Sequence, residues 1–344
     1  MKILHSMAGG QSGGAEMAFV DMLRAQKQAG MDVVAMTRAN EQRSPLIRQA
    51  DIPLYELPFS GVFDFKTKRS IENIIKDFNP DIVQTWMTRA VQKTPAWHKG
   101  LPPFIKIARL GGYYPMKHYQ DADYFIAQTP DLKKHIVETG RIDPERVRQI
   151  NQFAEVGQAG GILTRGEMKT PHDAFVFLSL GRYHVNKGLD ILLRAFQSVP
   201  GAHLWLAGDG PERAALENLA DELGVMERVH FLGWRTDRAD LLDLCDAVVF
   251  PSRHEPFGTV FAQAWAANRP LITTASQGPA QFVRDEEDAL LVGIDDMPAL
   301  IKAMNRVVRD HALRDILVRN GYERYLTEFT TQVVLKRTLE WYEA

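Results

Sequence analysis

The stretch AVVFPSRHEPFGTVFAQAWAAN (residues 247–268) decides the fold class, because a turn with proline and glycine joins two apolar segments in it. AVVFPS is typical of a buried strand, and FGTVFAQAWAAN is typical of a helix that follows it. In parallel sheets such a junction lies at the carboxyl edge of the strands, where ligands bind. Glu255 and Gly258 therefore fall where the helix start presents free N–H groups and partial positive charge.

The same alternation of short apolar runs and amphipathic segments continues along the whole chain. Strands are expected at 2–7, 32–37, 54–59, 81–86, 104–110, 124–129 and 147–153, and then at 175–181, 202–208, 229–234, 247–252, 270–275 and 289–293. Strands separated by helices pair in parallel, because a parallel crossover needs a dozen or more residues. The sequence therefore predicts an α/β protein with two doubly wound, Rossmann-like sheets.

A glycine-rich polar segment without periodicity, residues 157–173, separates the two halves and indicates a linker. We expect domains at 1–160 and 170–325, facing each other across a deep cleft, and a helical tail. The last helix, 326–344, is expected to pack back on the first domain.

Composition is that of a globular protein, with 45% hydrophobic and 24% charged residues among 344. No apolar run approaches the roughly 20 residues that cross a bilayer. The single cysteine, Cys245, excludes an internal disulfide and a multi-cysteine metal site, and we expect it to be buried. A cytoplasmic setting fits best.

The net charge of −2 conceals an asymmetry between the halves. Residues 1–165 carry 22 basic against 17 acidic side chains, and residues 166–344 carry 19 against 26. Chance variation and an anionic partner of the first half both explain this difference. Neither half is basic enough to indicate nucleic acid.

Phosphate-binding candidates follow the first strand of the second half. Gly181 and Arg182 end that strand, and Lys187 stands near the start of the next helix. A guanidinium binds phosphate with two parallel hydrogen bonds and an ammonium adds a point charge, so the pair suits a diphosphate. A surface arginine and a lysine near a helix start are the structural alternative. Gly208 and Gly210, in LAGDG, allow a close backbone approach and a positive φ.

In order and spacing, these motifs resemble the GT-B glycosyltransferases of family 4, which retain anomeric configuration. The resemblance covers most of residues 175–295. It is carried by Gly181-Arg182, Lys187-Gly188, Leu206 to Gly210, Val229 to Gly233 and Glu255 to Gly258. The first half is similar more loosely, through its glycine loop and strand order.

The resemblance implies a site for a nucleotide-diphosphate sugar, favouring a UDP-sugar, with no resident cofactor and no metal. The implied catalytic residues are Glu255, Arg182 and Lys187, and the implied donor-binding residues are Gly13, Gly14, Gly181, Arg182, Lys187, Phe231, Glu255, Pro256, Phe257, Gly258, Thr259 and Gln263. Gln263 replaces the family's usual glutamate, which binds the ribose hydroxyls. Its neutral amide weakens ribose affinity by about 1–2 kcal/mol. Asp295 and Asp296 are expected to be solvated rather than to hold Mg²⁺.

The first half is expected to bind the acceptor, a glycan or a lipid-linked glycan. Trp86 and Arg89 follow the fourth strand and Arg109 ends the fifth, so all three are candidates to line the acceptor site. Segment 59–75 interleaves Phe59, Val62, Phe63 and Phe65 with Lys66, Lys68 and Arg69. Such a pattern is typical of a helix on a membrane surface, although a half-buried helix start with solvated lysines has a similar composition.

The function expected is therefore transfer of a sugar to a cell-envelope glycan such as a lipopolysaccharide, in the cytoplasm or on the cytoplasmic side of the inner membrane. Two alternatives stay open: a catalytically weak nucleotide-sugar-binding protein, and another GT-B enzyme such as an epimerase. A dehydrogenase is a poor alternative, because the glycine loop lacks G-x-G-x-x-G spacing and no acidic residue closes the second strand.

Overall fold

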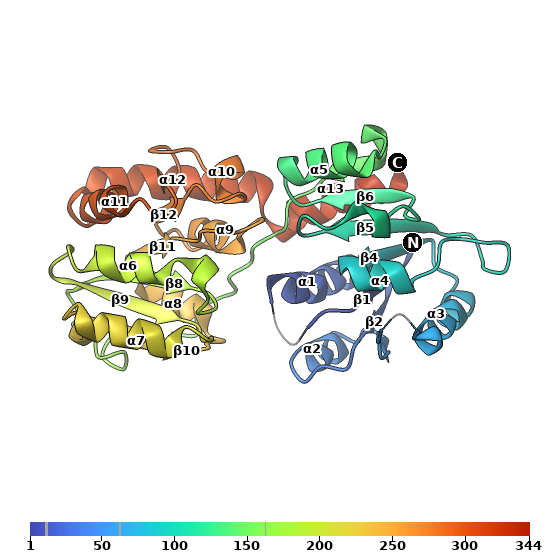
Figure 1. The fold of residues 1–344 in the computed structure, drawn as a ribbon, viewed down its shortest axis with the longest axis horizontal. Coiled ribbons are helices and arrows are strands. Elements are labelled where there is room, and N and C mark those ends of the chain that lie inside the picture. Colours follow the sequence, from blue (N-terminus) through green and yellow to red (C-terminus); the bar gives the residue numbers. More distant parts are fainter. Residues whose placement is uncertain (11–12, 62, 162) are drawn as a thin grey trace. The chain divides into compact units, whose positions relative to one another are not determined.

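The computed structural model describes residues 1–10, 13–61, 63–161 and 163–344. It consists of two compact units, Met1–Gln152 together with Thr331–Ala344, and Phe153–Thr330 (Figure 1). Each unit contains one parallel sheet with helices on both faces, as the alternation of strands and helices predicted.

The first unit contains a seven-stranded sheet in the order β3-β2-β1-β4-β5-β6-β7. Its strands are β1 (Lys2–Met7), β2 (Asp32–Thr37), β3 (Leu54–Glu56), β4 (Ile82–Trp86), β5 (Ile105–Leu110), β6 (Tyr124–Ala127) and β7 (Val147–Gln149). Its helices are α1 (Gly14–Gln28), α2 (Arg43–Gln49), α3 (Phe65–Phe78), α4 (Met87–Lys93), α5 (Pro130–Gly140) and α13 (Thr331–Glu343), with short 3₁₀ turns η1 (Met116–His118) and η2 (Pro144–Arg146).

The second unit contains a six-stranded sheet in the order β10-β9-β8-β11-β12-β13. Its strands are β8 (Phe175–Leu180), β9 (Ala202–Ala207), β10 (Val229–Gly233), β11 (Ala247–Phe250), β12 (Leu271–Thr274) and β13 (Leu290–Val292). Its helices are α6 (Leu189–Phe196), α7 (Arg213–Glu222), α8 (Arg238–Leu244), α9 (Thr259–Ala266), α10 (Pro279–Phe282), α11 (Met297–Arg309) and α12 (His311–Glu328), with 3₁₀ turns η3 (Val185–Lys187) and η4 (Met226–Arg228).

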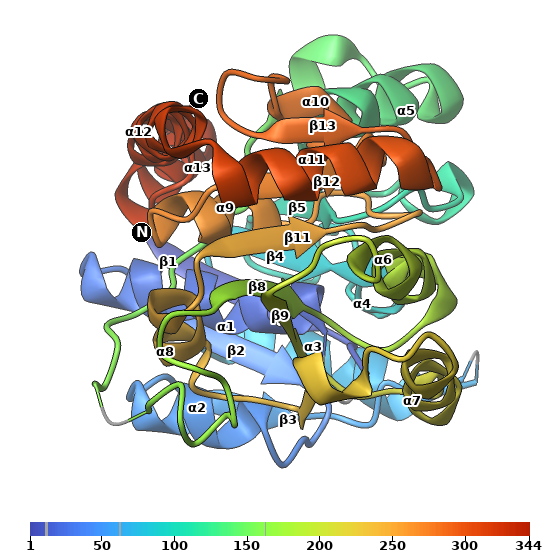
Figure 2. The same ribbon diagram turned by 90° about the vertical axis from the view of Figure 1, so that its left-hand side faces the viewer.

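Apolar layers on both faces hold the second sheet in place, as expected for parallel strands. One layer packs α6, α7 and α11 against the sheet, and the other packs α8 and α9 with Phe329. Figure 2 shows α6 and α7 on the opposite side of this sheet from α8 and α9.

The glycine-rich segment before β8 is part of the second unit and is fastened to it. Its described residues contain no helix or strand. Arg165 donates to the Leu244 carbonyl at 2.8 Å and to the Asp246 carboxylate at 2.9 Å. Thr170 accepts a hydrogen bond of 2.9 Å from the buried Trp205 indole. The segment is therefore a packed connection rather than a free linker.

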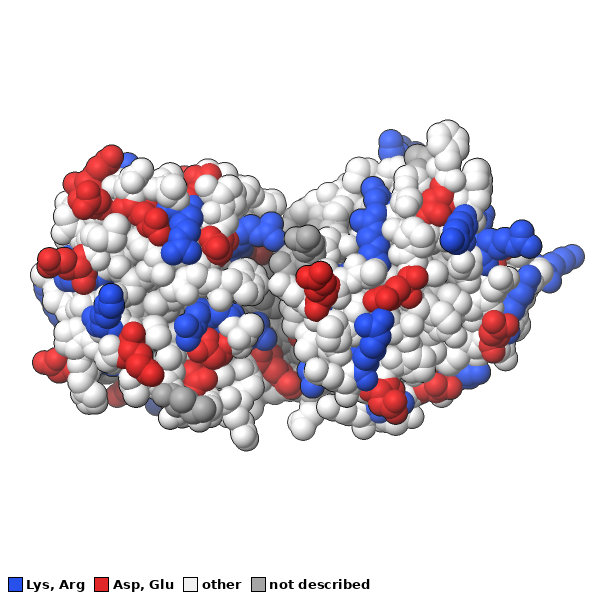
Figure 3. Space-filling view, turned by 90° about the horizontal axis from the view of Figure 1, so that it is seen from below, with Lys and Arg blue, Asp and Glu red and all other residues white. Residues whose placement is uncertain are grey.

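The C-terminal helix α13 belongs to the first unit and packs against α1. The hydroxyl of Tyr342 accepts a hydrogen bond of 3.3 Å from Gln26 and donates to Gln84 on β4. These buried polar contacts fix the helix on the sheet. On the face drawn in Figure 3, basic and acidic side chains are interspersed on each unit.

None of the helices in the described part of the chain combines the length and the apolar character that a membrane crossing requires.

Candidate functional site

The motif residues of the second unit meet at the point where its strand order reverses. β8 pairs with β9 on one side and β11 on the other, and the chain leaves these strands in opposite directions along the sheet. The segment 181–188 follows β8 and the segment 251–258 follows β11. Such a topological switch point is where open α/β sheets bind ligands.

Lys187 and Glu255 form an ion pair across this switch point. The Lys187 ammonium donates to the Glu255 carboxylate and lies 5.6 Å from the centre of the Phe250 ring. The Lys187 side chain is 25% exposed and the Glu255 side chain 16%. The sequence assigned these groups to different parts of a ligand, whereas in the free protein each satisfies the other.

Lys187 does not stand in the first turn of a helix. It ends the 3₁₀ turn η3, and Gly188 is the N-cap of α6. Gly188 has φ 62°, and a Cβ there would lie 2.2 Å from the Pro251 carbonyl oxygen. This close approach brings the lysine loop against the loop that carries Glu255, so only glycine fits.

Arg253 joins the two loops, a role that no sequence motif indicated. Its guanidinium forms a two-pronged ion pair with Asp190 at 2.7 and 2.8 Å and donates to the Val185 carbonyl. It also contacts Asp295 at 2.7 Å. The hydrogen bond to Asp190 raises the pKa of Arg253 further above its usual range. Arg253 therefore positions Lys187 and Glu255 relative to each other.

The Asp295-Asp296 pair is engaged rather than simply solvated. Asp295 binds Arg253, and Asp296 caps α11 by accepting a hydrogen bond of 3.0 Å from the Ala299 N–H. Both residues are exposed to solvent, as expected, and each carboxylate also has a protein partner.

Gly258 starts α9 at the site, as the opening stretch predicted. Its φ is 82°, and a Cβ there would lie 2.6 Å from Cγ of Glu255 and 2.8 Å from the Phe250 ring. In the described part of the chain, no side chain is seen to cap the first amides of α9. These amides can therefore accept an anionic ligand without losing a side-chain cap.

A third loop, after β12, holds Glu255 from the other side. The Gln277 side chain accepts a hydrogen bond of 3.1 Å from the Glu255 N–H and contacts the His254 ring at 2.8 Å. Gly278 donates its N–H to the Glu255 carbonyl at 2.7 Å. The backbone of Glu255 is thus fixed on two sides, while its carboxylate points to Lys187.

The glycine turn after β9 packs closely against the segment that follows β8, but its glycines do not have the positive φ that was expected. A Cβ on Gly208 would lie 1.8 Å from the Gly181 carbonyl oxygen, and one on Gly210 would lie 2.3 Å from that of Tyr183. The close approach is confirmed, but neither glycine adopts a positive φ; Gly181 does, at 148°. Arg182 is exposed at the strand end.

Several expected donor contacts are buried parts of the scaffold. Phe257 is 4% exposed and packs its ring against Phe261 and Phe282. Phe231 is half-buried beside the Tyr183 ring, with the ring centres 6.2 Å apart. Only backbone atoms of Phe257 remain suited to a ligand. Pro256 and Thr259 are half-buried at the loop and helix start.

Gln263 lies on α9 and is 7% exposed. Among the described residues, none is seen to hydrogen-bond its side-chain amide. Its side-chain amide therefore remains available to a ligand. Cys245 is also buried, and burial raises the pKa of its thiol to about 12, so it is inert as a nucleophile.

In the first unit, the glycine loop after β1 is occupied by a carboxylate. Glu16 accepts a hydrogen bond of 2.8 Å from the Gly10 N–H, and a Cβ on Gly13 would lie 2.6 Å from the same carboxylate. Among the described residues, no atom lies within 4 Å of a Cβ built on Gly14. Gly13 therefore makes room for Glu16, whereas Gly14 has no steric requirement.

Trp86 and Arg109 are buried, which corrects their expected placement at the open edge. Each is 2% exposed. The Trp86 indole donates to His5 at 3.0 Å, and the Arg109 guanidinium lies 5.3 Å from the Trp86 ring. Their side chains point to the same face of the sheet as His5, which α1 and α13 cover. Burial lowers the pKa of Arg109 to about 10 and that of His5 to about 4. Arg89, in contrast, is exposed.

Segment 59–75 divides into a buried part and an exposed part. Phe59 is fully buried, and Val62 lies outside the described residues. Phe63 is 87% exposed and Phe65 is 72% exposed. They stand at the start of α3, whose other face buries Ile71 against the core.

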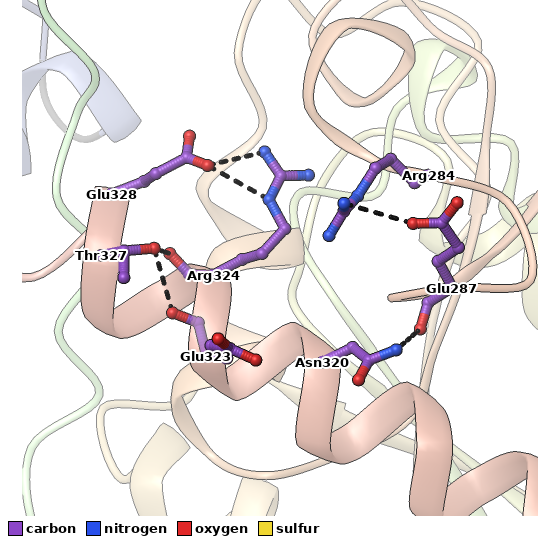
Figure 4. A pocket seen from close by; sticks show the side chains of 7 residues that line it. All are labelled: Arg284, Glu287, Asn320, Glu323, Arg324, Thr327 and Glu328. Atoms are coloured by element: carbon purple, nitrogen blue, oxygen red, sulfur yellow. Dashed lines mark hydrogen bonds and ion pairs between the residues drawn. The ribbon is translucent and has the colours of Figure 1, made fainter.

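A pocket of about 430 Å³ is lined by residues of α12 and of the loop before β13 (Figure 4). Arg284 and Arg324 line it and both bind the buried carboxylate of Asp288, at 2.9 and 3.1 Å. Asn320 donates to the Glu287 carbonyl at 2.8 Å. These contacts hold α12 against the loop before β13. The residues that line the pocket therefore have a structural role that requires no ligand.

Comparison with known proteins agrees with this fold. The family model described as glycosyl transferases group 1 matches residues 164–324. The lipopolysaccharide core biosynthesis glycosyltransferase LpsD of Rhizobium meliloti (strain 1021) is 34% identical over 351 residues, covering 100% of this chain and 98% of that protein. LpsE of the same organism is 31% identical over 352 residues, covering 99% and 98%. The crystal structure of Anabaena Alr3699/HepE in complex with UDP matches with a TM-score of 0.86 at 19% identity, over 99% of each chain.

Two parallel Rossmann-like units with such a structural neighbour define the GT-B fold, which confirms the predicted fold class. The chain belongs to the group 1 glycosyltransferases, and it has full-length homologues in lipopolysaccharide core biosynthesis.

Proposed function

We propose that the protein transfers a sugar, with retention of configuration, from a UDP-sugar to a glycan or glycolipid acceptor of the cell envelope, such as a lipopolysaccharide core. The observation that carries this proposal is the Lys187–Glu255 pair at the switch point, beside the uncapped start of α9. The names of LpsD and LpsE support the acceptor class, and the UDP complex of HepE supports the nucleotide.

The main requirement of this reaction is to stabilise the negative charge that develops on the leaving diphosphate. Lys187, Arg182 and the first amides of α9 would stabilise it, and Glu255 would accept hydrogen bonds from sugar hydroxyls. Donor binding would therefore exchange the Lys187–Glu255 contact for two ligand contacts. The bond from the anomeric carbon to the phosphate oxygen breaks, and a bond to the acceptor oxygen forms on the same side. The acceptor hydroxyl gives its proton to the leaving phosphate oxygen. These steps need no metal.

Gln263 would face the ribose of the donor. Its amide oxygen accepts from one hydroxyl and its NH₂ donates to the other, so it binds more weakly than a carboxylate accepting from both. This difference affects nucleotide affinity and leaves the phosphate contacts unchanged.

The acceptor would be lipid-linked and reached at the cytoplasmic membrane surface, with the enzyme as a cytoplasmic, peripheral protein. The exposed rings of Phe63 and Phe65 next to Lys66 and Lys68 support this proposal. Aromatic rings enter the headgroup region, and lysines are attracted to anionic lipids.

The test is a thermal-shift comparison of UDP, GDP and ADP with their sugars, repeated in EDTA. A ligand at 100 times its Kd adds about 2.7 kcal/mol of stability. We expect the largest shift with UDP compounds, unchanged in EDTA, and a smaller shift in Lys187→Ala. As a matched control, Lys169→Ala removes a lysine of the same unit outside the site and should respond like the wild type. An absent response to every nucleotide, or a strict metal requirement, would reject the proposal.

A further inference from the structure

Three arginines gather at the carboxyl edge of the first sheet and have no part in the donor site. Arg38 follows β2, Arg43 begins α2, and Arg89 lies in α4 directly after β4. β2 and β4 flank β1, so these residues surround the switch point of this sheet.

Arg38 and Arg89 bind the same oxygen atom. The Arg38 guanidinium donates to the Phe59 carbonyl, and Nη1 of Arg89 donates to it at 3.3 Å. Arg43 lies behind them and is 2% exposed; its guanidinium donates to the Arg38 carbonyl at 3.4 Å. Two like charges are thus held at one neutral acceptor, an arrangement that is unfavourable without an anion.

The surroundings do not supply that anion. Within the described residues, no ion pair joins Arg38, Arg43 or Arg89 to a carboxylate, and the remaining four residues of the chain are neither Asp nor Glu. Glu16 acts on Arg43 from a distance, and its carboxylate already binds the Gly10 N–H. Burial, and then the charge of Arg89, lower the pKa of Arg38.

The shared carbonyl belongs to a strained residue. Phe59 has φ 45°, in the left-handed region that a residue with a side chain avoids, and its ring is fully buried. The Phe59 N–H donates a hydrogen bond of 3.1 Å to the Thr67 hydroxyl. Such strain is typical of binding sites, and here it turns a carbonyl toward two arginines.

The need to anchor the loop after Phe59 does not explain why both Arg38 and Arg89 bind its carbonyl. Lys93, one turn after Arg89, already holds the same loop by donating to the Gly61 carbonyl at 2.7 Å and the Asp64 carbonyl at 3.2 Å, near the Asp64 carboxylate. Lys93 therefore has the neighbouring negative charge that Arg38 and Arg89 lack, and it provides a matched control.

We propose that Arg38 and Arg89, backed by Arg43, bind an anionic group on the acceptor saccharide, a carboxylate or a phosphomonoester. Both groups match the two-pronged geometry of a guanidinium. The inference rests on the proposed function, because it assigns the first unit to the acceptor, and it names the chemical class of that acceptor.

The probe is the core oligosaccharide released from a rough-type lipopolysaccharide, used intact, after removal of phosphates, and after reduction of carboxyl groups. Calorimetry without any donor should show that the wild type binds the intact form at least about tenfold more tightly than one of the treated forms, as expected for charged hydrogen bonds. The treatment that weakens binding identifies phosphate or carboxylate as the group bound.

Arg38→Gln and Arg89→Gln should lose this preference, and Lys93→Gln should keep it. Arg89→Lys keeps a charge and a donor for the Phe59 carbonyl, so it tests the site even if loss of that contact unfolds the loop. It should show an intermediate preference, because an ammonium lacks the two-pronged geometry of the guanidinium. Equal binding of all three forms by the wild type, including no binding, would overturn the inference, as would arginine variants that retain the preference. Because the titration contains no nucleotide, its result is independent of the UDP thermal shift, whose failure would reject the donor proposal alone.

Discussion

Gly258→Ala should destabilise the second unit and displace Glu255. The left-handed backbone at φ 82° costs a residue with a Cβ about 1–2 kcal/mol. The new methyl group would lie 2.6 Å from Cγ of Glu255 and 2.8 Å from the Phe250 ring. Phe250 is 1% exposed and cannot withdraw, so Glu255 must move. Overpacking of this kind adds about 1–3 kcal/mol.

The total of about 2–5 kcal/mol corresponds to a fall in the melting temperature of the second unit by about 4–20 °C. Differential scanning calorimetry measures this fall. Gly224→Ala is the matched control, because Gly224 has φ 66° in the same unit and a Cβ there meets no atom within 4 Å. It should cost only the backbone contribution, about 1–2 kcal/mol.

The difference between the two variants therefore isolates the contact with Glu255 and Phe250. Sugar transfer should fall in Gly258→Ala and persist in Gly224→Ala, since only the first moves the carboxylate. If the two variants melt alike, the close approach at Gly258 carries no free energy and the reasoning from its geometry is refuted.

Four further predictions concern single groups. Glu255→Ala should abolish most sugar transfer while UDP binding stays within about 1 kcal/mol, because its proposed partner is the sugar. Gln263→Glu should tighten UDP binding by up to about 1–2 kcal/mol, and 2′-deoxy-UDP should not share the gain. Phe63→Ser with Phe65→Ser should reduce sedimentation with anionic vesicles and leave the melting temperature unchanged, since both rings are exposed. Lowering the pH from about 6.5 to 4 should reduce the stability of the first unit by up to about 3 kcal/mol through His5, because its pKa of about 4 is below that of the unfolded chain and the unfolded state binds the proton first.

Each of these predictions has a result that contradicts it. Equal losses of UDP and UDP-sugar affinity in Glu255→Ala would assign the carboxylate to the phosphate loop. An equal gain for both nucleotides in Gln263→Glu would place the side chain away from the ribose. Unchanged vesicle binding of the Phe63 and Phe65 variant would remove the membrane proposal. An unchanged pH dependence in His5→Gln would show that other groups titrate.

Much of the fold could be predicted because its signals are local. The run AVVF followed by the helical segment after Gly258 specifies a strand, a turn and a helix within one crossover unit, and the same signal repeats through both halves. The need for glycine at 208, 210 and 258 could likewise be anticipated, because a strand-to-helix turn brings backbone segments close together.

The contacts between side chains could not be predicted in the same way. Lys187 and Glu255 are separated by three strands in sequence, and they meet only because β8 and β11 are neighbours in the sheet. Trp86 and Arg109 were expected at the open edge, but their strands point them to the face that α1 and α13 cover. The role of Arg253 depends on Asp190 in the first turn of α6 and on Asp295 in the loop after β13.

The two parallel sheets and the position of the candidate donor loops follow from the sequence alone, because hydrophobic periodicity and turn chemistry act over a few residues. The class of enzyme was implied by the resemblance of its motifs to a known family. Which charges neutralise one another depends on how the chain folds in space. In the folded protein, Glu255 forms an ion pair with Lys187, and Arg38 and Arg89 both bind the Phe59 carbonyl. Ion pairing depends on distances of a few ångströms between groups far apart in the chain, and strand order sets those distances.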